Sequence, residues 1–335
     1  MTRQAAVLGH PIAHSLSPLL HTAAYEHLGL DAEYRRIGVP EESLQDFLRG
    51  EGAAGDWMGW SVTMPLKAAM LSAVDHPSAR VTALGVLNTV IHRNADTSAG
   101  PQRTLAAENT DVDGIVAALG EAGLHPASST DRGSFGIIGA GATATAAMAA
   151  AAELGYTQVR SYARSIPRGR ELEPVAAALG LTLSVTELSN LPRELRTGTQ
   201  GSGPAPSDPA QLEPADGTPA QLDPADATPV QLTPVHLDAV VSTLPPRAAD
   251  EIAARLPCLD RPVPLLDVAY DPWPSALARS WEASGGPVVS GLVMLLHQAV
   301  KQVELFSAST STPAAELSEA SHAQMVAKMR RSIGL

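Results

Sequence analysis

Short apolar runs alternate with amphipathic stretches through the first third of the chain. Residues 5–8 are uniformly apolar, and residues 34–39 form a second candidate strand. Between them, Ser17 and Pro18 are typical of a helix start, with Ser17 as the cap and Pro18 at the first helical position. Apolar residues follow at helical spacing, and the same spacing recurs over residues 41–48. This rhythm predicts an α/β arrangement.

A second series of strands and helices begins at residue 134. The run F-G-I-I-G-A-G ends a buried strand and leads into an alanine-rich helix, and residues 158–163 predict the next strand of a βαβ unit. Strand signals return at residues 239–243 and 264–268. This order predicts a doubly wound, Rossmann-type sheet.

The segment after Gly291 has the periodicity of a long apolar helix. Its predicted buried face comprises Leu292, Leu295, Leu296, Ala299, Val303 and Phe306. We expect this helix to return to the N-terminal domain. The predicted domains are therefore a three-layer α/β domain of residues 1–113, completed by residues 291–335, and a Rossmann-type domain of residues 114–290.

A proline-rich insertion interrupts the second domain at about residues 197–235. It contains a near-repeat of ten residues, P-A-Q-L-E-P-A-D-G-T followed by P-A-Q-L-D-P-A-D-A-T. The proline spacing blocks both helix and sheet, so we expect a disordered insertion.

Composition narrows the class of function. The chain has 335 residues, a formal net charge of −12 and no basic stripe, which argues against a nucleic-acid partner. Cys258 is the single cysteine and suits a reducing compartment, and no run resembles a signal peptide or a membrane span. We expect a cytoplasmic enzyme for a small-molecule substrate, without a metal, as a monomer or homodimer.

A candidate cofactor loop lies between the strand after residue 134 and the helix that follows. Gly139, Ala140, Gly141 and Ala142 occupy the position at which a dinucleotide pyrophosphate meets a helix N-terminus. The next strand ends at Arg164, followed by Ser165 and Arg168, rather than at an acidic residue. Arginines there suit a ribose 2′-phosphate, so the sequence predicts NADP(H) over NAD.

Polar clusters follow several predicted strands of the first domain. Ser15 and Ser17 stand at the first turn, and Lys67 lies just inside a helix for which Thr63 is the predicted cap. Asp111 opens another helix. We expect Lys67 and Asp111 to meet and share a proton during catalysis. Asn88 and Gln298 would then bind substrate hydroxyls.

With these residues in place, the chain resembles the shikimate dehydrogenase family. The resemblance is carried by G-H-P-I-A-H-S-L-S-P, S-V-T-M-P-L-K, G-V-L-N-T, E-N-T-D-V-D-G, D-V-A-Y-D-P and G-L-V-M-L-L-H-Q, which occur in the order of the family and span nearly the whole chain outside the insertion.

The resemblance implies roles for individual residues. The shikimate pocket would be lined by Ser15, Ser17, Thr63, Asn88, Tyr270 and Gln298, with Lys67 and Asp111 as the catalytic pair. The cofactor would be bound by Gly139, Ala140, Gly141, Ala142, Arg164, Ser165 and Arg168, with Gly291 and Met294 beside the nicotinamide. The chain departs from the family pattern at Ser61, where asparagine is common, at Ala142 in the phosphate loop, and at Ala163 before Arg164.

The implied reaction is reversible reduction of 3-dehydroshikimate to shikimate by NADPH, a step of aromatic amino acid biosynthesis. Two alternatives stay open at this point: a quinate/shikimate dehydrogenase that uses NAD, and a catalytically silent cofactor-binding regulator.

Overall fold

The computed structural model of the protein describes residues 2–54, 56–97, 100–127, 132–197 and 236–335. The proline-rich insertion, predicted at about residues 197–235, lies outside these residues from residue 198 onward.

The first third of the chain forms a mixed six-stranded sheet. Its strands are β1 (Arg3–Gly9), β2 (Ala32–Gly38), β3 (Trp57–Val62), β4 (His76–Pro77), β5 (Thr89–Thr97) and β6 (Gly100–Glu108). They lie in the order β2-β1-β3-β5-β6-β4. β1 pairs in parallel with both of its neighbours, whereas β5 pairs antiparallel with β3 and β6.

Helices cover both faces of this sheet, as the three-layer prediction requires. The helices are α1 (Ser17–Leu28), α2 (Leu44–Arg49), α3 (Leu66–Ala69), α4 (Ala79–Leu84), α12 (Gly291–Ser307) and α13 (Glu319–Ser332). Alternate residues of β1 supply the two cores: Val7 packs with α1, α12 and α13, and Leu8 packs with α2 and α3.

The second sheet is entirely parallel. Its strands are β7 (Ser134–Ile138), β8 (Gln158–Ala163), β9 (Thr182–Glu187), β10 (Leu237–Ser242), β11 (Leu265–Asp267) and β12 (Val288–Ser290), in the order β12-β11-β10-β7-β8-β9. The chain runs outward from β7 to one edge and then from β10 to the other. This confirms the doubly wound arrangement and places a switch point between β7 and β10.

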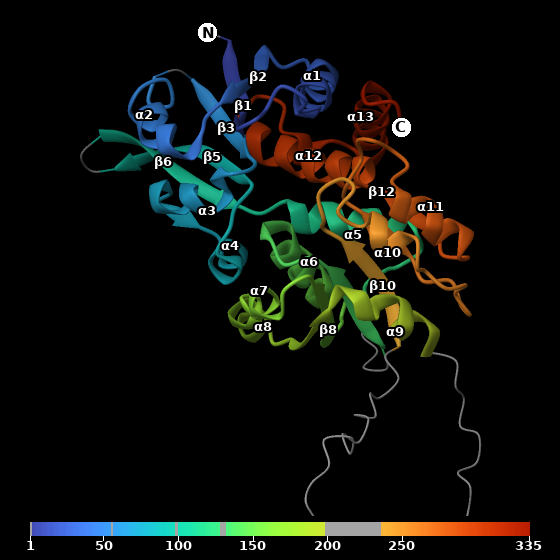
Figure 1. Cartoon of the computed structure of the whole chain (residues 1–335). Coiled ribbons are helices and arrows are strands. Elements are labelled where there is room, and N and C mark those ends of the chain that lie inside the picture. The colour runs from blue at the N-terminus through green and yellow to red at the C-terminus, as the bar shows by residue number, and fades with distance from the viewer. Residues whose placement is uncertain (1, 55, 98–99, 128–131, 198–235) are drawn as a thin grey trace, which may run out of the picture.

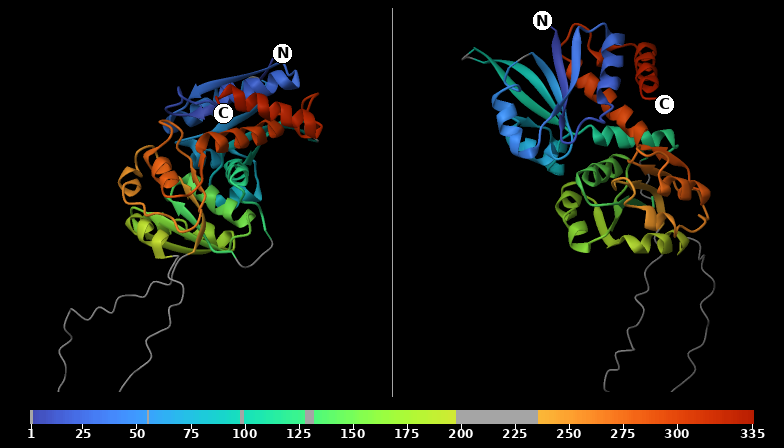
Figure 2. Two further views of the ribbon diagram at one scale, coloured as in Figure 1. Left: turned by 90° about the vertical axis from the view of Figure 1, so that its right-hand side faces the viewer. Right: turned by 45° about the horizontal axis from the view of Figure 1, so that its top comes forward.

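Helices α6 (Ala142–Glu153), α7 (Ile166–Arg170), α8 (Glu173–Ala178), α9 (Leu191–Thr197), α10 (Asp250–Ala253) and α11 (Ala276–Ala283) accompany this sheet. Figure 1 shows α5 (Asp111–Glu121) and α12 lying between the two sheets. Figure 2 shows the same placement from two other directions.

Helix α12 buries more of its surface than the single apolar face that the sequence predicted. Val293, Met294 and Val300 are also buried, because the helix contacts α5 as well as α1 and strands β3 and β5. Leu292 and Leu295 are only partly buried. A helix enclosed by two bodies buries residues around most of its circumference.

Two predicted helix caps are wrong. Ser17 is the first residue of α1 and not its cap, and Ser15 Oγ accepts the Ser17 N–H at 3.3 Å. Thr63 does not cap α3 with its side chain, because that helix begins only at Leu66, and the Thr63 carbonyl accepts the Leu66 N–H instead. Neither hydroxyl is therefore committed to capping its helix.

Within the described ranges, no helix combines the length and apolar character that crossing a membrane requires.

Candidate active site

A cavity of about 880 Å³ lies between the two halves of the molecule. Its wall on one side comes from the ends of β1 and β3 and from α3, and on the other from the loops that follow β7, β8, β10 and β11. The carboxyl ends of parallel strands at a switch point are the usual binding place in such sheets.

Lys67 and Asp111 meet at this cavity. Lys67 Nζ donates a hydrogen bond to Asp111 Oδ2, and both side chains are largely buried, 14% and 9% exposed. Lys67 is the second residue of α3 and Asp111 the first residue of α5. A carboxylate at a helix N-terminus is favoured by the helix dipole. The pair thus joins an ammonium donor and a proton acceptor at a site open to a ligand.

Asn88 orients this pair from the end of the turn before β5. Its Nδ2 donates to the second carboxylate oxygen of Asp111 at 2.8 Å and to Thr110 Oγ1 at 3.0 Å. Its Oδ1 accepts the Thr110 N–H at 2.7 Å. These contacts fix which end of the amide faces Asp111.

Gln298 reaches the same cluster from α12. Its Oε1 lies 3.5 Å from Asn88 Nδ2 and its Nε2 donates to the Leu295 carbonyl at 2.9 Å. The close approach of α5 makes this possible: a Cβ on Gly114 would lie 3.0 Å from Gln298 Cβ and 2.7 Å from the Met294 carbonyl oxygen. Because Gly114 has no side chain, α5 and α12 pack closely enough for Asp111 and Gln298 to line the same cavity wall.

A buried hydrogen-bond network lies beneath the substrate side of the cavity. Gln302 Nε2 donates to the Asn88 carbonyl at 3.2 Å and to Thr89 Oγ1 at 2.9 Å, which turns its Oε1 toward the Ser61 hydroxyl at 2.6 Å. Ser61 Oγ in turn accepts from the Tyr34 hydroxyl at 2.6 Å. The Ser61 hydroxyl therefore has both an acceptor and a donor, which are the amide of Gln302 and the phenol of Tyr34.

His21 ends this network. Its Nε2 lies 3.3 Å from Gln302 Oε1 and its Nδ1 lies 3.3 Å from the Tyr25 hydroxyl. Because an amide oxygen only accepts, Nε2 carries the hydrogen and Nδ1 accepts from Tyr25. Complete burial lowers the pKa of His21 to about 3, against a smaller opposing effect of Gln302. The imidazole is a neutral structural group and not an acid–base catalyst.

Tyr270 borders the cavity from the loop after β11. Asp267 holds this loop, since its carboxylate accepts from Ser275 Oγ at 2.6 Å and from the Ala269 N–H at 3.4 Å. Burial raises the pKa of Tyr270, with a further contribution from Asp271. The phenol is therefore a neutral donor toward the cavity.

The loop between β7 and α6 forms the opposite end of the cavity. Gly139 has φ +116°, and a Cβ there would lie 2.4 Å from Thr243 Oγ1. A Cβ on Gly141 would meet nothing within 4 Å, so its absence leaves open space at the N-terminus of a twelve-residue helix. This geometry suits a pyrophosphate approached by backbone N–H groups.

Arg164 and Arg168 stand on the rim beyond this loop, and both are exposed. Arg168 pairs with Glu171 at 3.0 Å on the surface. These residues fit the adenosine end of NADP(H), whose 2′-phosphate requires a cation.

Every site residue predicted from the sequence lines this one cavity. The set is Ser15, Ser17, Thr63, Lys67, Asn88, Asp111, Gly139, Ala140, Gly141, Ala142, Arg164, Ser165, Arg168, Tyr270, Gly291, Met294 and Gln298. The described ranges hold no group of three or more His, Cys, Asp or Glu side chains arranged to bind a metal.

Sequence reasoning missed Gln302, Tyr34 and His21. Gln302 stands four residues after Gln298, on the same face of a helix, which was an available signal. Tyr34 lies in a predicted apolar strand, and His21 ends a polar stretch at the start of a predicted helix, where the spacing assigned it no role.

Comparison with known proteins agrees with this geometry. Residues 7–90 match the model of the shikimate dehydrogenase substrate binding domain. A curated shikimate dehydrogenase (NADP(+)) from Methylobacterium radiotolerans is 29% identical over 309 residues, covering 90% of each chain.

Solved structures are similar over nearly the whole length. A shikimate 5-dehydrogenase from Mycobacterium fortuitum is 33% identical with a TM-score of 0.68, covering 98% of this chain and 97% of that one. A shikimate 5-dehydrogenase from Thermus thermophilus, in complex with NADP(H) and shikimate, is 25% identical with a TM-score of 0.65, covering 99% of this chain and 100% of that one. This chain belongs to the shikimate dehydrogenase family.

Proposed function

We propose that the protein is an NADP-dependent shikimate dehydrogenase, which reversibly reduces 3-dehydroshikimate to shikimate. The observation that carries this proposal is the Lys67–Asp111 pair, placed in the same cavity as a dinucleotide-type glycine loop. Family membership gives the reaction, and the paired donor and acceptor supply what that reaction needs at the substrate oxygen.

The residues at the second sheet fit NADP(H). The open space beside Gly141 would admit a pyrophosphate, and Arg164 and Arg168 would donate hydrogen bonds to the extra phosphate. Gly291 and Met294 would hold the nicotinamide near Asp111. When bound, the reduced cofactor supplies the hydride for the carbonyl carbon.

Lys67 and Asp111 would transfer the proton to and from the substrate oxygen. Because the two groups titrate as one coupled unit, the transfer is assigned to the pair and not to either residue alone. Asn88 keeps one carboxylate oxygen of Asp111 hydrogen-bonded, and this leaves the other for Lys67. The pair is thereby held in one orientation before the substrate arrives.

The remaining polar side chains orient the ring of the substrate. Ser15, Ser17 and Thr63 offer hydroxyls on one side, and Gln298 and Tyr270 offer donors on the other. Such a set suits a ligand with one carboxylate and several hydroxyls.

We extend the proposal to the domain organisation. Residues 1–113 with 291–335 would form the substrate domain and residues 114–290 the cofactor domain. Support comes from the core beneath β1, which contains side chains of both α1 and α12. The protein would act in the cytoplasm as a monomer or homodimer on small molecules.

The initial rate of cofactor reduction tests the function. Purified protein is assayed with shikimate or quinate, each paired with NADP or NAD. We expect fast turnover for shikimate with NADP. Faster turnover for quinate, or for NAD, would instead place the chain among quinate/shikimate dehydrogenases, and no turnover in any pairing would support a silent regulator.

A further inference from the structure

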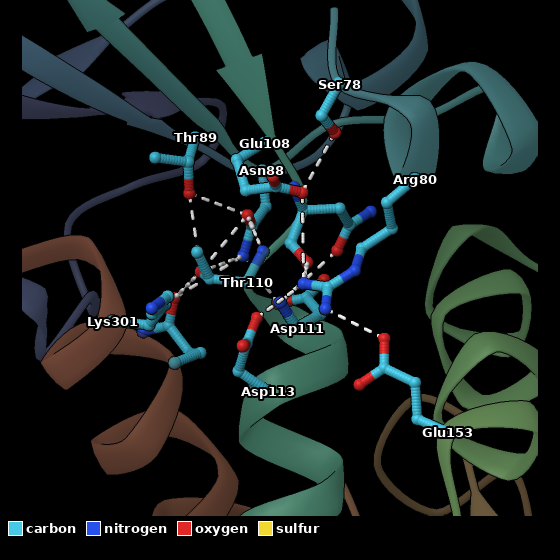
Figure 3. A network of polar contacts seen from close by, with 12 residues as sticks. Ser78, Arg80, Asn88, Thr89, Glu108, Thr110, Asp111, Asp113, Glu153 and Lys301 are labelled. Atoms are coloured by element: carbon cyan, nitrogen blue, oxygen red, sulfur yellow. Dashed lines mark hydrogen bonds and ion pairs between the residues drawn. The ribbon is translucent and has the colours of Figure 1, made fainter. Parts of the chain in front are cut away.

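Arg80 does not line the cavity, yet its guanidinium reaches the segment that carries Asp111 (Figure 3). It is the second residue of α4, two residues after Ser78, whose hydroxyl caps that helix by accepting the Val81 N–H at 3.1 Å. The capped start of α4 therefore fixes where the arginine side chain begins.

One nitrogen of the guanidinium, Nη1, forms the first arm and donates hydrogen bonds to residues on both sides of Asp111 in the chain. Arg80 Nη1 donates to the Asn109 carbonyl at 3.1 Å and to Asp113 Oδ2 at 2.6 Å. Asn109 Oδ1 accepts the Asp111 N–H at 3.2 Å. The residues two before and two after Asp111 in the chain are thus tied to one cation.

The other arm leads away from the site. Arg80 Nη2 donates to Glu153 Oε1 at 2.8 Å, and Glu153 is the last residue of α6 in the second half of the molecule. The two arms can therefore be tested separately, because only the first touches the Asp111 segment.

Burial and charge make Arg80 a permanent cation. Burial alone would lower the pKa of Arg80, but the neighbouring carboxylates of Asp113, Glu153 and Glu108 outweigh it and raise the pKa. The Arg80 side chain is 24% exposed and that of Asp113 28%, so this contact is less screened by water than a surface pair. Arginine suits the place because its planar fork satisfies several acceptors at once.

We propose that Arg80 is a positioning residue for the dehydrogenase reaction. By holding Asn109 and Asp113, it fixes the first turn of α5 and with it the place of the Asp111 carboxylate opposite Lys67. This role rests on the proposed function of the pair. Small displacements of reacting groups lower the rate of the chemical step more than they weaken substrate binding.

Steady-state kinetics of three full-length variants test the role. In Arg80→Met, which keeps the aliphatic stem, we expect kcat for shikimate oxidation to fall about tenfold or more while KM for shikimate changes less than about twofold. Arg80→Lys should recover part of kcat. Glu153→Gln, the matched control, should keep kcat within about twofold of the unchanged protein, because it removes only the negative charge that Arg80 Nη2 faces on α6.

Amide hydrogen exchange over residues 109–115 gives a readout that does not depend on turnover. Exchange there should accelerate in Arg80→Met and not in Glu153→Gln. Unchanged exchange and unchanged kcat in folded Arg80→Met would overturn the proposal. A loss of kcat in Glu153→Gln equal to that in Arg80→Met would also overturn it, since Arg80 would then act through its contact between the two halves of the molecule and not through the Asp111 segment.

A second variant covers the case in which Arg80→Met does not fold. Asp113→Asn keeps the shape of the side chain and removes its charge, so it should lower kcat and accelerate exchange in the same segment. A folded Asp113→Asn with normal kcat and normal exchange would refute the positioning role. Absence of turnover in the unmodified protein would refute the proposed function alone, and the exchange data would still decide the role of Arg80.

Discussion

The two ends of the cavity are built in opposite ways. At the substrate end, Asn88, Ser61 and Gln302 are buried and hydrogen-bonded to one another or to their neighbours. At the cofactor end, the loop at Gly141 offers backbone and open space, and Arg164 is exposed on the rim.

This difference separates two ways of recognising a ligand. The substrate end gains precision from a network in which the loss of one member leaves others unpaired in the interior. The cofactor end gains affinity from backbone dipoles and solvated charges, which can be changed singly. Substitutions at the first end should therefore affect stability as well as binding, and substitutions at the second should affect binding alone.

The largest effect is expected for Lys67→Ala. Removing the ammonium takes away half of the proton-transfer pair, and we expect kcat to fall by about 10²- to 10⁴-fold, with little change in KM for shikimate. Stopped-flow and steady-state rates of NADPH formation measure it. A variant with near-normal kcat would show that this lysine is not part of the reacting pair.

Gln302→Ala should be the most destabilising of these changes. It leaves the Ser61 hydroxyl without its acceptor and removes the amide donor to Thr89 Oγ1 and to the Asn88 carbonyl, which keeps only the Val62 N–H, at a cost of about 3 kcal/mol in the free energy of unfolding. Urea denaturation measures this cost, with Gln158→Ala on the exposed start of β8 as the control. If both variants unfold at the same urea concentration, the network does not stabilise the substrate end.

Arg164→Ala tests the cofactor end. Losing a charge-assisted contact of about 2 kcal/mol should raise KM for NADP about 30-fold and leave KM for NAD and the unfolding midpoint unchanged. Arg170→Ala is the matched control, because Arg170 lies outside the cavity wall and faces Glu173 at 3.9 Å. An equal rise in KM for NADP and NAD would show that Arg164 does not bind the 2′-phosphate.

The smallest effect concerns acid stability of the first sheet. His92 is buried without a hydrogen-bond partner at either ring nitrogen, and burial, with a smaller effect of Arg103, lowers its pKa from 6.5 to about 3. The unfolded chain binds a proton below pH 6.5 that the folded chain does not, so stability falls as pH drops from 6.5 toward 3. His92→Phe removes this proton linkage.

Between pH 6.5 and 5.5, His92→Phe should lose about 1 kcal/mol less unfolding free energy than the unchanged protein. Denaturant unfolding at the two pH values measures the difference. His21 has the same depressed pKa but also bonds Gln302 and Tyr25, so His21→Phe should be destabilising already at pH 7. Parallel pH curves for His92→Phe and the unchanged protein would contradict the expected linkage.

Much of the fold and of the cavity wall was accessible from the sequence. Strand β8 was predicted with the bounds that the structure gives it, because it follows the glycine loop and the alanine-rich helix in the order of a βαβ unit. Lys67 and Asp111 were predicted to meet because each opens a helix directly after a strand or turn, and the structure joins them.

What the sequence did not predict depends on tertiary contacts. The caps at Ser17 and Thr63 failed because hydroxyls near a helix start can face a cavity instead of the backbone. The role of Gln302 depends on Ser61 and His21, which lie far from it in the chain and reach it only in the folded protein. Local spacing contains no information on such partners.

The enclosed position of α12 also orders events during synthesis. Gln298 and Gln302 complete the substrate end, yet they emerge from the ribosome only after all strands of the second sheet. A nascent chain that has finished β6 lacks both amides and the helix that covers one face of β1. The sheet that is translated first is therefore the last to be covered by all of its helices. The substrate pocket is complete only after α12 has been translated.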